Sequence, residues 1–289
     1  MFAKLTDTNK AAIFSVLVLA MAVVAGLVIR ALRITSEFAA AALYMFTPAE
    51  AVLIMLLIVT REGYSRAGWK VLGLHRLGLS VWWIALGVTL LITVAASVTV
   101  WATPLASFAV PEQGIGGRLI GFVVQVLLFT FTFVLGEEVG WRGYLLPKLL
   151  SLGRRGALVL SGVVWATWHM PLILLTPILP VGNKLISLPL FYGTFVAASF
   201  FFGYLRIYTG SVWPASIGHA VHNAAWGTLG AFTATSYPLI VNKYLVGDYG
   251  ILILVGAVIG AIWVGRRLMK SDPDEPRPRV ASSEVPDAK

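Results

Sequence analysis

Two adjacent carboxylates and an arginine directly follow an apolar stretch of this chain, at a place where charge is costly. The stretch 118–134 reads RLIGFVVQVLLFTFTFV and continues as LGEEVGWRGYL at 135–145. A charge inside a bilayer costs roughly 2.5–3.5 kcal/mol on insertion scales. We therefore expect Glu137, Glu138 and Arg142 to face a cavity or one another, where a carboxylate could transfer protons.

Helical geometry separates the two glutamates. Neighbouring residues on a helix diverge by about 100°, whereas residues four apart, such as Glu138 and Arg142, can pair on one face. Glu137 is then left without a local partner, and an isolated carboxylate in apolar surroundings suits a general base. The alternative is that both glutamates lie in a loop at the membrane boundary, with Arg142 as a flanking cation. Gly136 and Gly140 form a GxxxG pair, which predicts close packing of another helix.

A second candidate is the histidine of WATWHMP at 165–171. His169 is the only ionisable residue between Gly156 and Lys184. It could ligate a metal, or bind a water or an oxyanion. The structural alternative is an imidazole hydrogen-bonded to a backbone carbonyl beside the kink that Pro171 introduces.

A third candidate is SIGHAVHN at 216–223, where His219, His222 and Asn223 share one helical face. His219 and Asn223 are the better pair for one cavity, whereas His222 could support them or face a neighbouring helix. We assign His222 no catalytic role. The chain contains no HExxH or GxSxG motif, and Asp248 lies outside the apolar stretches.

The composition of the chain indicates the class of protein that positions these residues. The chain of 289 residues is 58% hydrophobic and only 12% charged, against roughly 25% charged residues in soluble domains. This is typical of a membrane protein, in which a net charge of +9 reflects basic cytoplasmic loops. Nothing in the sequence resembles a nucleic-acid-binding motif, and the absence of cysteine excludes disulfides and thiolate ligands.

A span needs about 20 apolar residues, and the sequence predicts an all-α polytopic protein with about eight of them. The first apolar stretch could pass for a signal peptide, but its length and the spans that follow favour a retained helix. Residues 1–270 are expected to form one transmembrane domain with its motifs at about 118–230, followed by a disordered, Pro-rich cytoplasmic tail at 271–289. The predicted spans are 11–30, 38–60, 79–102, 118–137, 157–178, 188–208, 212–233 and 249–265.

The distribution of basic residues predicts the orientation. With eight spans, seventeen of the 22 Lys and Arg residues fall on the side of both termini, which the positive-inside rule makes cytoplasmic. Glu137 and His219 then lie in the cytoplasmic half of the bilayer, and we expect the active site there. His169 lies roughly 20 Å along its helix from Gly156, which suggests a deeper site or a helix that projects into the cytosol.

The three segments together resemble the CPBP family of intramembrane proteases, which includes the CAAX endopeptidase that trims prenylated proteins. The first family motif is EExxxR, the second is an aromatic residue (usually Phe) followed by xxxH, and the third is HxxxN or HxxxD. The sequence matches them in order with Glu137, Glu138 and Arg142, then Trp165 and His169, then His219 and Asn223.

The resemblance implies an eight-helix membrane fold and a role for each motif residue. Glu137 would activate a water, while His169, His219 and Asn223 would hold that water and stabilise the oxyanion. Glu138 and Arg142 would support them, and Trp165, which replaces the usual Phe, would pack against the site. Glu137, His169 and His219 are also compatible with Zn²⁺, but we expect no obligatory metal.

These observations favour an intramembrane endopeptidase that cleaves near the C-terminus of a membrane-anchored protein or peptide, of which a prenylated CAAX protein is one example. A non-catalytic immunity or scaffold protein of the same fold remains open. A proton-coupled transporter that uses the same ionisable groups is the third hypothesis, although the chain shows no inverted repeat.

Overall fold

The computed structural model describes residues 5–179 and 181–269, so the tail expected at 271–289 lies outside the described residues. Helices form nearly all of the described secondary structure. The α-helices are α1 (Asp7–Ala31), α2 (Glu37–Tyr44), α3 (Thr47–Ile54), α4 (Arg66–Lys70), α5 (Trp82–Trp101), α6 (Gly114–Phe131), α7 (Phe133–Glu138), α8 (Leu146–Leu149), α9 (Arg154–Trp168), α10 (Met170–Leu175), α11 (Lys184–Thr209), α12 (Trp213–Ala231) and α13 (Ile251–Leu268). The π-helices are η1 (Met55–Val59), η4 (Val139–Leu145) and η6 (Ile240–Leu245), the 3₁₀ turns are η2 (Glu62–Tyr64), η3 (Leu79–Val81) and η5 (Leu150–Leu152), and the strands are β1 (Ser107–Phe108) and β2 (Thr233–Ala234).

The predicted all-α membrane protein is confirmed. In the described part of the chain, seven helical stretches are long and apolar enough to cross a membrane. They correspond to seven of the eight predicted spans and run over Asp7–Ala31, Glu37–Val59, Leu79–Trp101, Gly114–Leu152, Arg154–Leu175, Lys184–Thr209 and Ile251–Leu268. The other predicted span, 212–233, is α12, a helix of 19 residues whose histidines and asparagine make it less apolar.

Prolines divide the fifth span where the sequence predicts. α9 ends at Trp168, and α10 begins at Met170 with Pro171 in its first turn. α10 then ends at Leu175, because Thr176 adopts an extended conformation (φ −132°, ψ 160°), as is usual for a residue before a proline such as Pro177. His169 therefore lies at the junction of two helices.

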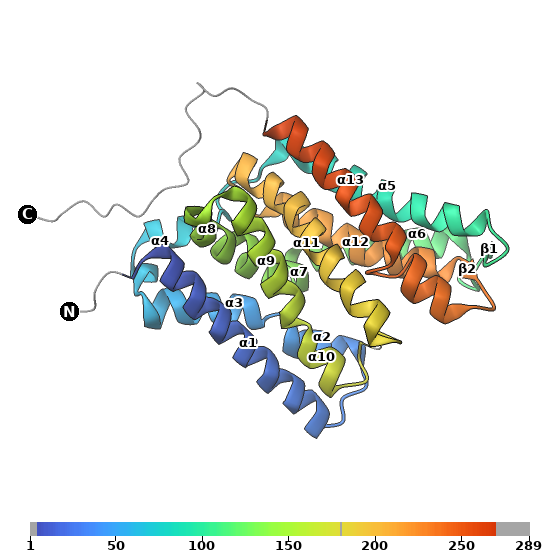
Figure 1. The fold of residues 1–289 in the computed structure, drawn as a ribbon, viewed down its shortest axis with the longest axis horizontal. Helices are drawn as coiled ribbons and strands as arrows, with labels where there is room; N and C mark the ends of the chain where they lie inside the picture. The colour runs from blue at the N-terminus through green and yellow to red at the C-terminus, as the bar shows by residue number, and fades with distance from the viewer. Residues whose placement is uncertain (1–4, 180, 270–289) are drawn as a thin grey trace, which may run out of the picture.

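The loops predicted to share one side of the membrane do meet at one end of the bundle. At this end, which we call the basic end, Thr8 contacts Ser151 (3.3 Å) and the Trp213 indole donates to the Leu74 carbonyl (2.9 Å). Figure 1 shows α4 and α8 close to the start of α1, while β1 and β2 lie far away at the other side of the molecule.

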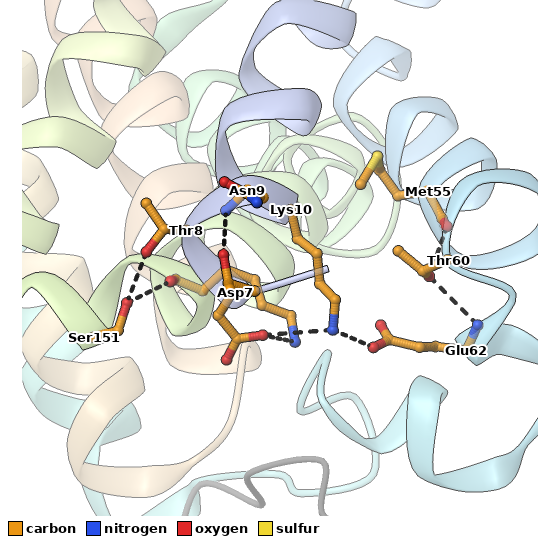
Figure 2. A network of polar contacts seen from close by, with 10 residues as sticks. Asp7, Thr8, Asn9, Lys10, Met55, Thr60, Glu62 and Ser151 are labelled. Carbon is orange, nitrogen blue, oxygen red and sulfur yellow. Dashed lines mark hydrogen bonds and ion pairs between the residues drawn. The ribbon is translucent and has the colours of Figure 1, made fainter. Parts of the chain in front are cut away.

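A polar network holds the basic end together (Figure 2). Lys10 forms ion pairs with Glu62 (2.5 Å) and Asp7 (3.6 Å), and Lys148 forms one with Asp7 (2.9 Å). Both lysines are buried, so their charges need these carboxylates close by. The network joins the start of α1 to η2 and α8.

The opposite end, which we call the far end, is joined by a short sheet that the sequence does not predict. β1 and β2 pair antiparallel, with Ser107 opposite Ala234. The Thr235 hydroxyl also donates to the Leu105 carbonyl (2.6 Å). The loops after α5 and α12 are thereby held to each other.

The GxxxG pair packs closely against another helix, as expected. A Cβ placed at Gly136 would lie 2.9 Å from the Phe46 ring, and one at Gly140 would lie 2.5 Å from the Pro48 Cβ. The start of α3 therefore rests directly on α7 and η4, the segment that carries Glu137, Glu138 and Arg142.

Candidate active site

The four residues predicted to be catalytic line one cavity of about 240 Å³. Glu137 comes from the end of α7, His169 from the junction of α9 and α10, and His219 and Asn223 from α12. Apolar side chains of α5, α11 and α13, such as Ile92 and Phe195 among others, complete the walls. The fold thus brings together groups that are up to 86 positions apart in the sequence (137 to 223).

Glu137 accepts hydrogen bonds from two indoles. Its Oε2 takes one from Trp165 Nε1 (2.9 Å) and a longer one from Trp141 Nε1 (3.3 Å), and the residue is only 2% exposed. No partner of Oε1 is found among the described residues. One oxygen of the carboxylate is therefore fixed while the other is free to meet a water.

Two expectations about Glu137 were wrong. It does have a local partner, Trp141, four residues away. Trp165, which we expected only to pack against the site, supplies the shorter hydrogen bond. Both errors have the same origin, because a tryptophan counts as apolar in a hydropathy pattern although its indole N–H is a donor.

Glu138 forms a buried charged cluster with Arg142 and His219. Its Oε1 accepts from Arg142 Nη1 (2.8 Å) and from His219 Nδ1 (2.9 Å). The predicted Glu138–Arg142 pair is confirmed, and both side chains are fully buried. The Arg142 guanidinium also lies 4.2 Å from the centre of the Trp165 ring, a cation–π contact. This cluster fixes the orientation of the His219 ring.

The position of His169 agrees with both interpretations of this residue, a ring bound to a backbone carbonyl and a group that lines the site. Its Nδ1 lies 3.0 Å from the Trp165 carbonyl oxygen. A carbonyl can only accept, so Nδ1 carries the proton and Nε2 of the neutral ring keeps a lone pair. The ring is held in place by Trp168 and Phe195, each 4.6 Å away between ring centres, and it still lines the cavity.

Nε2 of His219 and the side-chain amide of Asn223 have no hydrogen-bond partner within the described chain. Both residues lie on the cavity-facing stripe of α12. They can therefore interact with a molecule bound in the cavity.

The structure adds a pair that the sequence did not predict. His222 Nε2 lies 2.7 Å from Asp248 Oδ1, and both residues line the same cavity. Burial works against the charge of Asp248, but the bond to His222 and the nearby imidazoles of His169 and His219 keep the pKa of this carboxyl below its usual range. Asp248 lies outside the apolar stretches of the sequence, and only the fold shows that its loop returns to the cavity.

Over residues 5–179 and 181–269, no group of three or more His, Asp or Glu side chains is placed to hold a metal ion. The set considered for Zn²⁺, Glu137, His169 and His219, lines one cavity without converging on one point. Glu137 Oε2 and His219 Nδ1 already have protein partners.

Residues 119–225 match the family model described as Rce1-like, type II CAAX prenyl endopeptidase. The matched segment begins in α6 and ends in α12. It contains Glu137, His169, His219 and Asn223, but not Asp248. A search of curated proteins found no match to the chain.

Proposed function

Because the chain belongs to the CAAX protease (CPBP) family through its Rce1-like segment, we propose that it is an intramembrane endopeptidase that uses a glutamate-activated water. The observation that carries this proposal is the single cavity shared by Glu137, His169, His219 and Asn223. A buried carboxylate, two imidazoles and an amide supply a base, a water-binding group and oxyanion donors, which are the groups that peptide hydrolysis requires.

In this mechanism Glu137 removes a proton from a water that His169 orients. Trp141 and Trp165 fix Oε2 of Glu137, and the Nε2 lone pair of His169 accepts a hydrogen bond from the same water. The resulting hydroxide attacks the carbonyl carbon of the scissile bond.

The oxyanion that forms is stabilised by α12. The Asn223 amide donates an N–H, and His219 donates from Nε2 when its ring is protonated. Glu138 on Nδ1 supports a positive charge on that ring. Removal of one oxyanion donor typically lowers kcat by about 10²–10³.

For the substrate, we propose a membrane-anchored protein or peptide cleaved near its C-terminus, with a prenylated CAAX tail as the first to test. The apolar walls of the cavity, which include Phe195, Phe201 and Phe202, suit aliphatic residues next to the scissile bond. A substrate of this kind reaches the cavity from the bilayer.

The test is cleavage of a farnesylated CAAX peptide by the purified protein, followed by mass spectrometry. Glu137→Gln keeps the size of the side chain but removes the base, and we expect it to abolish cleavage. Glu50→Gln, at an exposed position of α3, is the matched control and should cleave at the wild-type rate. Equal cleavage by wild type and Glu137→Gln would overturn the proposed role.

We propose that no metal is obligatory. Cleavage should then persist after dialysis against a strong chelator, with a zinc protease inhibited in parallel as a control. Loss of activity that Zn²⁺ restores would assign the water activation to a metal instead.

We also propose that the basic end and both termini face the cytoplasm, as the distribution of Lys and Arg suggests. Glu137 then lies closer to the cytoplasm than Asp248, and the cavity continues from α7 towards the far end, where Asp248 and Leu179 line it.

A further inference from the structure

We propose that His222, held by Asp248, is a further catalytic group of this cavity and gives a proton to the amine that leaves when the peptide bond breaks. This inference rests on the proposed function and extends it to the second half of the reaction. His222 lies in the segment matched by the family model, whereas Asp248 lies beyond it.

The geometry of the pair supports this role. His222 Nε2 is bound to Asp248 Oδ1 (2.7 Å), which leaves Nδ1 without a partner among the described residues. The two side chains are 17% and 30% exposed, respectively. A ring that is held at one nitrogen by a carboxylate, and is open at the other, is the usual arrangement of a histidine that transfers protons.

Asp248 is brought to the cavity by a tightly folded loop between η6 and α13. A Cβ at Gly247 would lie 2.3 Å from the Asn242 carbonyl oxygen, and one at Gly250 would lie 2.4 Å from that of Leu245. The loop therefore folds back on η6 so closely that a side chain with a Cβ would not fit at position 247 or 250. Its course places Asp248 opposite His222.

The neighbouring residue anchors the same loop to the site. Tyr249 is 2% exposed, and its ring lies 5.3 Å from that of Phe191. Phe191 stacks on Phe195 at 4.3 Å, and Phe195 contacts the His169 ring. The loop and the candidate catalytic residues thus belong to one packed unit, so Asp248 holds a defined position.

Hydrolysis of a peptide bond needs a proton donor for the leaving amine, and His222 and Asp248 can supply it. In the first half, Glu137 takes one proton from water and hydroxide forms the new C–O bond. In the second half, the C–N bond breaks and its electrons pass to nitrogen, which needs a proton because an amide anion is a very poor leaving group. His222 enters this step as an imidazolium whose Nε2–H donates to Asp248, and it gives its Nδ1 proton to that nitrogen. The proton held by Glu137 then passes through solvent to His222, which restores both groups.

The two other histidines of the cavity have different tasks in the proposed mechanism. Nδ1 of His169 is bound to a backbone carbonyl and Nδ1 of His219 to Glu138, and their remaining nitrogens serve the water and the oxyanion in the proposed mechanism. Asn223 cannot carry a proton. The charged or titratable groups that line the cavity around His222 come from α2, α7, the α9–α10 junction, α12 and the loop before α13, and they are Glu37, Tyr44, Glu137, His169, His219 and Asp248.

The experiment compares two substrates that differ only in the leaving group: a farnesylated CAAX peptide and its depsipeptide, in which an ester replaces the scissile amide. An alcohol leaves far more readily than an amine and needs less help from an acid. We expect His222→Gln to slow amide cleavage by about 10²-fold or more, as is typical of lost general-acid catalysis. Ester cleavage should slow only a few-fold.

Variants at Asp248 test the same role without changing the imidazole. Asp248→Asn should lower the ratio of amide to ester cleavage in the same direction as His222→Gln, and Asp248→Glu should restore part of it. His75→Gln, at an exposed loop position, is the matched control and should leave both rates unchanged. Thermal unfolding of each variant shows whether it is folded.

The outcomes separate this inference from the proposed function. If the wild type cleaves both substrates while His222→Gln slows both equally or neither, the role of His222 is wrong and the protease proposal stands. If the wild type cleaves neither the amide nor the ester, the proposed function itself fails.

Discussion

Glu137 and Glu138 are adjacent in the sequence, yet the fold gives them different partners. Glu137 receives two neutral indole N–H groups, whereas Glu138 binds a guanidinium and an imidazole. The first carboxylate keeps one oxygen without a partner among the described residues. The second neutralises the buried charge of Arg142 and orients His219.

This difference predicts that the same substitution destabilises the protein at position 138 but hardly at position 137. Glu138→Gln removes the charge that compensates Arg142, and loss of one partner of a buried ion pair costs roughly 3–5 kcal/mol. We expect a clear fall in the melting temperature in detergent. Glu137→Gln should melt close to the wild type, because the amide oxygen of glutamine can still accept from the indoles.

A double variant tests whether the loss of stability comes from the unpaired charge of Arg142. Glu138→Gln combined with Arg142→Met leaves no unpaired charge and should recover much of the lost stability. If Glu138→Gln alone melts like the wild type, the cluster does not stabilise the fold in this way.

Trp165 is expected to contribute to catalysis through its indole N–H. Trp165→Phe keeps an aromatic ring and removes the hydrogen bond to Glu137, and a bond to a charged group is worth roughly 1.5–3 kcal/mol. We expect kcat to fall at least several-fold, with a small change in KM. Trp213→Phe is the matched control, since this indole donates to the Leu74 carbonyl at the basic end and not to Glu137. Equal kinetics for the two variants would contradict the assignment.

The sequence predicted four polar residues that line the cavity, but neither all of the polar groups there nor all of their contacts. Three motifs on apolar stretches were enough to select Glu137, His169, His219 and Asn223. The indole donors were missed because hydropathy does not record a single N–H group. Asp248 was missed because a loop position carries no information about where the loop returns.

Among the elements, the junction of α3 with α7 and η4 positions the site most directly. Glycine at positions 136 and 140 allows Phe46 and Pro48 to approach the backbone of the segment that carries Arg142. Although η4 is a π-helix, Arg142 Nη1 still lies 2.8 Å from Glu138 Oε1. This close packing fixes the charged cluster relative to α3.

Gly140→Ala should therefore be destabilising. Its Cβ would lie 2.5 Å from the Pro48 Cβ, and overpacking of this kind typically costs roughly 1–3 kcal/mol. Gly121→Ala on α6, where nothing lies within 4 Å of the new Cβ, should be neutral or slightly stabilising. Equal melting temperatures for the two variants would show that α3 can move away at little cost.

Element boundaries were predictable where proline or a loop sets them. The ends of α9 and α10 follow from Pro171 and Pro177. The second span, predicted at 38–60, is found at Glu37–Val59, where α2, α3 and η1 follow one another. The fourth was predicted to end at 137, but its helical stretch continues to Leu152, and Glu138 and Arg142 within it pair with each other.

For the whole molecule, the arrangement of loops at two ends predicts which sites a reagent can reach. The chain has no cysteine, so single cysteines can be introduced at exposed positions of each end, Leu152 at the basic end and Ser236 at the far end. We expect a membrane-impermeant maleimide to label Ser236→Cys in intact cells. Leu152→Cys should react only after the membrane is permeabilised.

The opposite labelling pattern would invert the proposed orientation. A cytosolic protein with an exposed cysteine is the control for leaking cells. Labelling of both positions in intact cells, together with labelling of this control, would show that the reagent had entered the cells. The result also decides whether a cytoplasmic substrate meets Glu137 before Asp248.

The cavity has a further consequence for how the protein is made. Its walls come from α2 near the start of the chain and from α13 at the end of the described residues, with Ile253 and Ala257 on α13. Membrane helices enter the bilayer in the order of their synthesis, so α13 arrives after the helices that carry Glu137, His169 and His219, and it brings one wall of the cavity and the loop that holds Asp248. Until then the cavity around Glu137 lacks this wall and Asp248, so we expect the proposed protease to become active only after α13 has been inserted.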